Sequence, residues 1–433
     1  MSERALLVSI GDLPVGELRE QNGVWTFQYS DTWLRFDGRH TLSPHLPLQR
    51  EPFIDGASVR PVQWYFDNLL PEEGQRTLLA ADARLDAADA FGLLSWYGAE
   101  TAGSLTLLPP DAPANAGAEA LRTLSDAELS QRIRQLPRVP LTHGAVKRMS
   151  LAGAQHKLAV VMRDGVLYEP SGASASLHIL KPEHPDPDYP HSVANEWFVM
   201  RLAAESGLAV PPVHRRYVPE PAYIVDRFDR IVRNGKIERL HAIDACQLLG
   251  LDRSFKYQQG SIANLSRLAD ACRSPAVART RLFTWVVFNV LTGNGDAHLK
   301  NLSFLITGAG VQLAPHYDLI STIVYESRAF DKPDWPQSTH LAWPILDARR
   351  FAEVDRQLMI AAGVELGLNR GTAERLLDEC RRRIVPAAEH VYAAFEARTG
   401  EAGLQSPATR AGEARCLRAI IHAVIREMTE RLS

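Results

Sequence analysis

The chain has few cysteines and no long apolar run. Its 433 residues include four cysteines, Cys246, Cys272, Cys380 and Cys416, and no two of them form a C-x-x-C pair. A zinc or redox motif built on paired cysteines is therefore excluded, and a reducing cytoplasm is the compartment that fits. No apolar run reaches the roughly 18 residues of a membrane helix, and the run at 5–8 is too short for a signal peptide. We expect a cytoplasmic protein that does not contact a membrane.

The chain also lacks an excess of charge of either sign. Lys and Arg number 48 against 51 Asp and Glu, which gives a formal net charge of -3 at pH 7. Without a strong positive field the whole chain is not drawn to DNA or to an anionic membrane. Any contact with nucleic acid is expected to be local or to involve a partner. What the chain does have is apolar residues, 45% of the total, enough for more than one packed core.

Changes of pattern divide the chain into four parts. Short apolar runs between turn residues at 5–60 are typical of strands, and the pattern becomes helical at 61–103. At 108–119, prolines, alanines and glycines occur without periodicity, which indicates a linker. Strand patterns follow, and the rest is mostly helical apart from one strand pair near 301–317. We predict an α+β protein divided into a β-rich N-terminal module (1–107), a linker (108–122), a mixed α/β lobe (123–242) and a helical lobe (243–433).

The mixed lobe contains the clearest local patterns. Apolar runs at 157–162, 176–181 and 222–226 predict strands. A helix is expected at 193–206, and Gly207 sits where a left-handed cap would end it.

The stretch 293–301, GNGDAHLKN, follows a strongly apolar helix and opens with glycines that break it. Asp296 is therefore expected on a loop, where catalytic groups are often found. Asn301 follows five residues later. This is the spacing of the kinase catalytic loop, where the aspartate accepts the proton of the substrate hydroxyl and the asparagine coordinates a metal ion. The same residue types also form ordinary turns, and that interpretation of the loop stays open.

A predicted β-hairpin connects this loop to a second acid. The apolar runs 302–307 and 311–314 flank a Gly-Ala-Gly turn. The hairpin would fold the chain back and return Tyr317 and Asp318 to the neighbourhood of Asn301. An amide and a carboxylate there would be suitable oxygen ligands for magnesium.

A transition-metal site is the alternative for the same region. His298 and His316 occur close to Asp296 and Asp318, and mixtures of His and carboxylate suit zinc or iron. Such a site would indicate a metal-dependent hydrolase. Magnesium prefers oxygen ligands, and Asn301 suits magnesium better, so the amide favours phosphoryl transfer.

Phosphoryl transfer also needs a lysine near the phosphates. Lys181 ends a predicted apolar strand, so its ammonium would be held at a sheet edge. At about 100° per residue, Glu196 falls on the apolar face of its helix, opposite Arg201 and Glu205. A carboxylate on an apolar face needs a partner, and a Lys–Glu ion pair is the arrangement that sets the phosphate lysine in kinases. A partly exposed Glu196 without this role is the alternative.

The segment 150–157, SLAGAQHK, precedes the first strand of the mixed lobe and contains mostly small residues. Small residues let backbone N–H groups approach phosphates. The segment is not a Walker A motif, and an ordinary surface turn is the alternative. Its position upstream of Lys181 favours a phosphate-binding loop.

Together these motifs resemble the HipA family of serine/threonine kinase toxins from bacterial type II toxin–antitoxin modules. The resemblance covers most of the chain, with the motifs in family order. They are Ser150–Lys157, Ile179-Leu-Lys181-Pro, Asn195-Glu196, Val225-Asp-Arg-Phe-Asp-Arg230, Cys246-Gln247, Lys256-Tyr257, Gly295–Asn301 and Tyr317-Asp318. The resemblance implies a two-lobed fold distantly related to the phosphoinositide-kinase and protein-kinase folds.

The resemblance also implies roles for the matched residues. Asp296 would be the catalytic base, Asn301 and Asp318 the magnesium ligands, and Lys181 the phosphate lysine. Ser150 matches the family's autophosphorylated serine, whose modification is understood to eject the loop and stop catalysis. The residues expected to bind ATP are Ala152, Gly153, Ala154, Gln155, His156, Lys157, Lys181, Val225, Asp226, Arg227, Phe228, His298, Leu299, Lys300, Asn301, Tyr317 and Asp318.

The implied activity is ATP- and magnesium-dependent phosphorylation of an aminoacyl-tRNA synthetase, typically the glutamyl enzyme, which stalls translation and causes growth arrest or persistence. The usual partner is a small HipB-like helix-turn-helix antitoxin that binds operator DNA, so contact with DNA would be indirect. A catalytically silent binding or corepressor module is the remaining alternative. Such chains usually lose a catalytic residue, whereas Asp296, Asn301, Asp318 and Lys181 are all present here.

Overall fold

The protein is described by a computed structural model, which covers residues 3–112, 120–145, 147–149, 151–172, 174–233, 236–397 and 405–433. The chain forms two compact units. The first unit consists of Met1–Lys181, Asp226–Ser254 and Ser303–Ala314. The second consists of Pro182–Val225, Phe255–Leu302 and Pro315–Ser433. Each unit is therefore assembled from stretches that are separated in the sequence.

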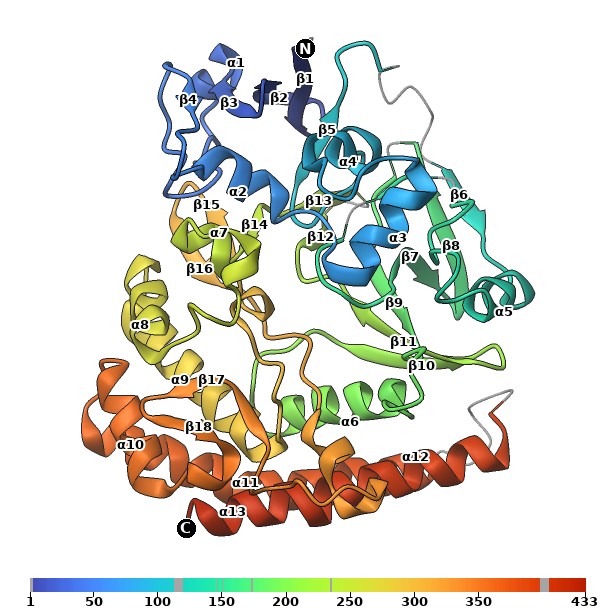
Figure 1. Ribbon diagram of the computed structural model, residues 1–433, viewed down its shortest axis with the longest axis vertical. Coiled ribbons are helices and arrows are strands. Elements are labelled where there is room, and N and C mark those ends of the chain that lie inside the picture. The colour runs from blue at the N-terminus through green and yellow to red at the C-terminus, as the bar shows by residue number, and fades with distance from the viewer. Residues whose placement is uncertain are drawn as a thin grey trace. The chain divides into compact units, whose positions relative to one another are not determined.

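The first unit opens with a five-stranded antiparallel sheet in the order β4-β3-β2-β1-β5 (Figure 1). Its strands are β1 (Arg4–Ile10), β2 (Leu13–Gln21), β3 (Val24–Tyr29), β4 (Phe53–Ile54) and β5 (Leu105–Leu108). Side chains alternate across β3, so Trp25, Phe27 and Tyr29 are buried together. The helices of this region are α1 (Asp31–Arg35), α2 (Pro61–Asp67), α3 (Glu73–Ala83) and α4 (Ala90–Tyr97). The strands before residue 60 and the helices α2 to α4 after it are as predicted, whereas the short helix α1 lies within the stretch expected to form strands.

Four further strands of the first unit pair in the order β9-β7-β8-β6, all antiparallel. They are β6 (Ala120–Thr123), β7 (Leu158–Arg163), β8 (Val166–Ser171) and β9 (His178–Pro182). The predicted strands at 157–162 and 176–181 correspond to β7 and β9. The remaining elements of this unit are α5 (Asp126–Arg134), β12 (Arg230–Arg233), β13 (Lys236–Arg239), β14 (Ala242–Asp244), α7 (Ala245–Leu249), β15 (Ser303–Thr307) and β16 (Gly310–Leu313).

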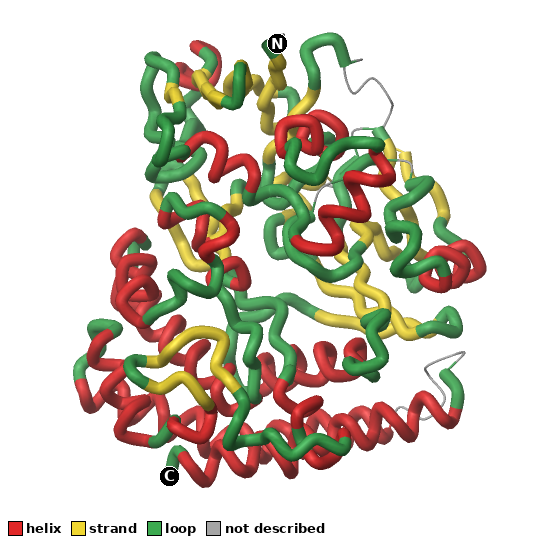
Figure 2. Tube along the Cα trace, viewed as in Figure 1, coloured by secondary structure: helices red, strands yellow, loops and turns green. Residues whose placement is uncertain are grey.

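The second unit is mostly helical (Figure 2). Its helices are α6 (Ser192–Glu205), α8 (Ile262–Ala271), α9 (Pro275–Thr292), α10 (Arg356–Glu365), α11 (Arg370–Ala397), α12 (Pro407–Ala419), a π-helical stretch (Ile420–Ile425) and α13 (Arg426–Arg431). A hairpin of β10 (Val213–Tyr217) and β11 (Pro221–Asp226) precedes most of them. Across the described ranges, no helix is both long and apolar enough to cross a membrane.

One prediction for the helical part was wrong. A second strand pair, β17 (His340–Ile345) with β18 (Ala348–Arg350), lies outside the single pair expected near 301–317. Its register is irregular between His340 and Ile345, and Pro344 interrupts the strand pattern. A proline within a short run argues against a strand when only the sequence is available.

Helix α6 agrees closely with its prediction. It spans Ser192–Glu205, and Gly207 just after it has a left-handed backbone with φ of +92°. Glu196 is 5% exposed, while Arg201 and Glu205 are exposed. The helical periodicity therefore identified the buried face correctly.

The start of α6 is held by an acid. The Glu183 carboxylate accepts hydrogen bonds from the backbone N–H groups of Ser192 at 2.9 Å and Val193 at 3.3 Å. These amides have no partner within the helix, so a carboxylate is well placed there. Burial nevertheless raises the pKa of Glu183 to about 7, and Glu413 raises it as well.

Candidate active site

The candidate catalytic loop begins where α9 is forced to end. Gly293 follows the last helical residue and has a left-handed backbone with φ of +65°. A Cβ at Gly293 would lie 2.6 Å from a Val424 side-chain carbon, which is too close. Both the conformation and the space therefore require glycine at this position, and the helix cannot continue past it.

Side chains then fix the turn that carries Asp296. The Asn294 amide donates to Oδ1 of Asn289 at 2.8 Å, and Gly295 N–H donates to Oγ1 of Thr322 at 2.7 Å. The backbone N–H of Asp296 donates to Oδ1 of Asn294 at 3.0 Å. Asp296 therefore lies on a rigid turn rather than on a loose loop.

Four neighbours determine the electrostatics of Asp296. Its carboxylate accepts a hydrogen bond from the Tyr257 hydroxyl, and the Tyr257 ring packs edge-on against His298 with centroids 5.1 Å apart. Burial raises the pKa of Asp296, and the nearby Asp318 raises it further. His298, Tyr257 and Lys256 lower it by less, so the pKa of Asp296 lies above its usual value. A raised pKa makes a carboxylate a better proton acceptor when it is ionised.

Asn301 is tied to the same turn. It is buried at the end of the short 3-10 helix Leu299–Asn301, and its side-chain amide donates to the backbone carbonyl of Asp296 at 3.0 Å. The Trp343 indole donates to the carbonyl of Ala297 at 2.8 Å. With its nitrogen engaged, the Asn301 amide has an oxygen to offer as a ligand.

The predicted hairpin after this turn is confirmed. β15 and β16 are paired from Phe304↔Leu313 to Thr307↔Gly310. Beyond the hairpin, the Tyr317 hydroxyl donates to the carbonyl of Lys300 at 2.8 Å.

Asp318 has an unusual backbone. Its φ of +58° lies in the left-handed region, which is uncommon outside glycine and is often found at functional sites. Its charge acts on Asp296. The two acids therefore interact in the fold despite their separation in the sequence, and the predicted approach of Asp318 to Asn301 stays a prediction.

A buried asparagine supports the segment that follows Asp318. The Asn195 side chain on α6 donates to the carbonyl of Ser321 at 2.9 Å and accepts from its N–H at 3.0 Å. It also donates to the Tyr325 hydroxyl at 3.2 Å. The sequence had given no role to Asn195, Tyr257 or Thr322. Only the family motifs drew attention to the first two.

The other predicted nucleotide-binding residues lie mainly in the first unit. Gly153 has φ of +105°, and Lys157 Nζ donates to the carbonyl of Ala152 at 2.6 Å. Lys181 is buried at 8% exposure and belongs to the first unit, whereas Glu196 belongs to the second, so their ion pair stays a prediction. Ser150 lies outside the described residues.

Arg227 has a different environment from the one expected of an adenine contact. Its guanidinium is buried and forms two hydrogen bonds with Asp229, at 2.9 and 2.7 Å, and lies 3.5 Å from Glu100. Any contact with adenine would therefore have to come from its backbone.

The transition-metal alternative finds no support. His316 is buried, its ring stacks on Trp285 with centroids 6.3 Å apart, and burial lowers its pKa to about 3. Among the residues that the structure describes, no three His, Cys, Asp or Glu side chains are grouped to hold a metal ion.

Comparisons with known proteins agree with this geometry. The HipA-like C-terminal domain matches residues 149–388, and the HipA N-terminal domain matches residues 6–108. The protein named "Putative kinase Y4mE" of Sinorhizobium fredii is 36% identical over 90% of this chain and 93% of its own length. The serine/threonine-protein kinase toxin HipA of Shewanella oneidensis is 33% identical over 74% of this chain and 76% of its own length.

A solved structure extends the similarity to the fold. A chain in the complex of Shewanella oneidensis HipA, HipB and operator DNA matches 98% of this chain and 99% of its own length, with a TM-score of 0.76 and 28% identity. The predicted α+β kinase-like fold is thereby confirmed. With both domains matched in order and the fold shared from end to end, the chain belongs to the HipA family of kinases.

Proposed function

We propose that this protein is an ATP- and magnesium-dependent serine/threonine kinase in which Asp296 is the catalytic base. One observation carries the proposal. The side chain of Asn301 is hydrogen-bonded to the backbone carbonyl of Asp296 across a single rigid turn, and the charge of Asp318 acts on the Asp296 carboxylate. This combination of a base, an amide and a second acid is what phosphoryl transfer to a hydroxyl requires.

Each of these residues would have a distinct role in phosphoryl transfer. Asp296 accepts the proton of the substrate hydroxyl as that oxygen bonds to the γ-phosphorus and the bond to ADP breaks. Asn301 and Asp318 supply oxygen ligands, which suit magnesium. A bound magnesium ion would neutralise charge on the transferred phosphoryl group. The left-handed backbone of Asp318 supports its role, because strained conformations are retained where a side chain must be aimed.

The nucleotide-side residues complete the proposal. Lys181 contacts the phosphates, and Glu196, buried on α6, pairs with it. Residues 152–157 of the loop 151–157 cover the phosphates with their backbone, and Val225 to Phe228 meet the adenine. Ser150 is the site of autophosphorylation.

The proposed substrate is an aminoacyl-tRNA synthetase, the glutamyl enzyme first, and the proposed partner is a HipB-like helix-turn-helix antitoxin. A structural neighbour solved with HipB and operator DNA supports the choice of partner, and a relative named as a HipA kinase toxin supports a toxin module. The synthetase rests on the resemblance of the sequence motifs alone. The net charge of -3 agrees with contact to DNA through the antitoxin alone.

The test is incubation of the purified protein with labelled ATP and magnesium, alone and with a panel of aminoacyl-tRNA synthetases, followed by mass mapping. We expect phosphate on Ser150 and on one synthetase, and none with Asp296→Ala. Asp347→Ala, which changes an exposed aspartate in the β17–β18 turn, should behave as the wild type. Label transferred by Asp296→Ala would remove Asp296 from the base role. A wild type that transfers none would favour the silent binding module.

A further inference from the structure

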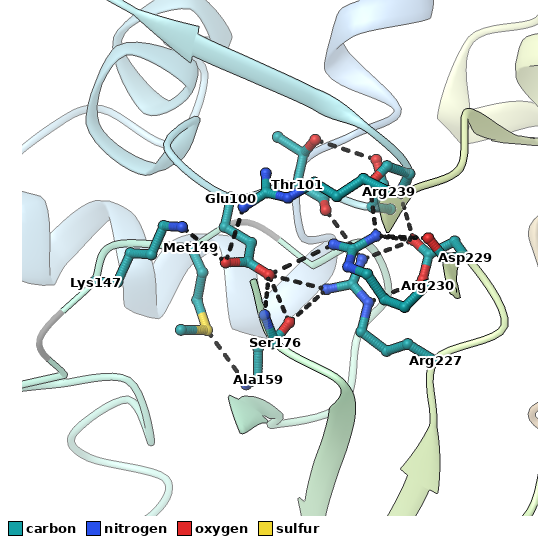
Figure 3. Close-up of polar contacts among 12 residues, drawn as sticks. Glu100, Thr101, Lys147, Met149, Ala159, Ser176, Arg227, Asp229, Arg230 and Arg239 are labelled. Atoms are coloured by element: carbon teal, nitrogen blue, oxygen red, sulfur yellow. Dashed lines mark hydrogen bonds and ion pairs between the residues drawn. The ribbon is translucent and has the colours of Figure 1, made fainter. Parts of the chain in front are cut away.

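A buried acid in the first unit gathers cations from distant parts of the chain. Glu100 is fully buried just after α4. One of its oxygens lies 3.5 Å from Arg227 and 3.5 Å from Arg230, and the other lies 3.1 Å from Lys147 and 3.7 Å from Arg239 (Figure 3). Burial alone would raise the pKa of Glu100, but the four cations keep it well below its usual value. The carboxylate is therefore ionised and central to this region.

The charges of this group do not cancel. We call Glu100, Lys147, Arg227, Asp229, Arg230 and Arg239 the Glu100 cluster. Asp229 is its second acid and pairs with Arg227 at 2.7 Å and Arg230 at 3.0 Å. Four cations thus face two carboxylates. Because the cations are in excess, removal of one of them still leaves each carboxylate paired, whereas removal of an acid would increase the uncompensated buried positive charge.

One of the four cations differs from the others by its position in the chain. Lys147 lies three residues before Ser150 and enters the segment that leads to the loop 151–157. Its Nζ also donates to the carbonyl of Ser174 at 3.1 Å, and its side chain is only 6% exposed. The three arginines of the cluster come from residues 227–239 instead. Lys147 is therefore the link between the cluster and the loop.

The same segment contacts the N-terminal module, residues 1–107, at three places. The contacts are Lys147 with Glu100, the Arg148 guanidinium 3.4 Å from the centroid of the Trp96 ring, and a parallel bridge of Gly153 with Pro71 in which Glu72 N–H donates to the Gly153 carbonyl at 3.3 Å. Met149 attaches the segment to β7 as well, because the Ala159 N–H on that strand donates to the Met149 sulfur at 3.2 Å (Figure 3). The N-terminal module thus contributes contacts before and within the loop.

We infer that the N-terminal module positions the loop 151–157 for nucleotide, and that Lys147, through Glu100, is the principal positioning residue. This inference rests on the proposed function, in which that loop covers the phosphates of ATP. Lys147 is not among the residues proposed to contact the nucleotide. It limits the conformations of the free loop, so that ATP does not have to supply the ordering free energy on binding. The N-terminal module then sets nucleotide affinity without contributing to the chemical step.

The test compares two substitutions that remove a cation from the same oxygen of Glu100. Lys147→Met releases the loop segment, whereas Arg239→Met leaves it attached. We expect Lys147→Met to weaken ATP binding and raise KM for ATP by about tenfold, with kcat within about twofold of wild type. Arg239→Met should change neither constant. Lys147→Arg should restore most of the affinity, because it keeps the charge.

Hydrogen exchange of the loop in the absence of nucleotide gives a readout that does not depend on kinase activity. Amides of 151–157 should exchange faster in Lys147→Met than in wild type or Arg239→Met, at equal thermal stability. Trp96→Ala, which changes a side chain that is already 37% exposed, should give a smaller increase of the same kind. Equal exchange and equal ATP affinity in all variants would overturn the inference. A wild type that binds no ATP would instead overturn the proposed function, while the exchange comparison would still test the attachment of the loop.

Discussion

The hydroxyl of Tyr257 donates a hydrogen bond to the carboxylate of Asp296, and the ring that carries it packs edge-on against His298. The acid proposed as the catalytic base is thus oriented by a side chain that precedes it by 39 residues. Tyr257 is 37% exposed, so its ring lies at the surface rather than in the core. The hydroxyl both aims the carboxylate and stabilises its ionised form.

Tyr257→Phe should lower kcat by about tenfold, since one hydrogen bond to a charged group is worth on the order of 1.5 kcal/mol. KM for ATP should change little, because the contact does not involve the nucleotide loop. The measurement is steady-state phosphorylation of the synthetase substrate. Tyr392→Phe removes a hydroxyl that bonds Arg418 on the helical surface and is the matched control. Wild-type kcat in Tyr257→Phe would mean that the phenol does not orient the base.

Asp318→Asn should raise the magnesium concentration needed for half-maximal activity by about tenfold or more, because a charged ligand is replaced by a neutral one. Asparagine tolerates the left-handed backbone, so the fold should be unaffected. Asp331→Asn makes the same change at an exposed residue with φ of +62° and should leave the magnesium requirement as it is. Magnesium titration of activity distinguishes the two. An unchanged requirement in Asp318→Asn would argue against Asp318 as a ligand.

Asn195→Ala should lower the free energy of unfolding by about 2–4 kcal/mol, because it leaves both backbone groups of Ser321 without their partner in a buried setting. It should also raise the magnesium requirement, since Ser321 is three residues from Asp318. Asn68→Ala removes an equally buried asparagine that donates to the carbonyls of Trp64 and Leu251. That control should lose stability without a change in magnesium dependence. The same dependence in both variants would show that Asn195 stabilises the unit without positioning Asp318.

Glu183→Gln should change how stability depends on pH. The pKa of Glu183 is about 7 in the folded protein, above its ordinary value of 4.5, so this group's contribution is complete at low pH and is lost as pH rises through that window. The loss is about 3 kcal/mol between pH 4.5 and 7. Glutamine cannot ionise, so the thermal midpoint of the variant should fall less than that of wild type between pH 5 and pH 8. Glu365→Gln, at an exposed position of α10, should keep the wild-type fall. Parallel curves for wild type and Glu183→Gln would contradict the shifted pKa.

Local signals were sufficient for the elements that carry the candidate site. Gly293 ends α9 because its left-handed backbone favours glycine, and the sequence already contained that break. The hairpin turn at 308–310 lies between two apolar runs, and the periodicity of α6 identified Glu196 as buried. In each case the deciding interaction lies within a few residues, so a sequence pattern can encode it.

Contacts between residues far apart in the chain could not be predicted from the sequence. β5 pairs with β1 although almost the whole N-terminal module lies between them, and Asn195 meets Ser321 across 126 residues. Charged residues such as Arg227 and Asp229 are rarely buried unless they are paired, so the sequence alone favours a surface turn at this position. Their pairing with Glu100 depends on the tertiary fold. The burial of the Glu100 cluster therefore could not be inferred from residue type.

The first unit includes Ser303–Ala314, which is synthesised after helices α6, α8 and α9 of the second unit. A nascent chain therefore cannot complete its N-terminal half while that half leaves the ribosome. β14 remains without its neighbour β15 until residue 307 has been translated. A ribosome that stalls earlier releases a fragment in which both units are unfinished. For an enzyme proposed to stop translation, this order of assembly means that only a chain made nearly to its end can become active.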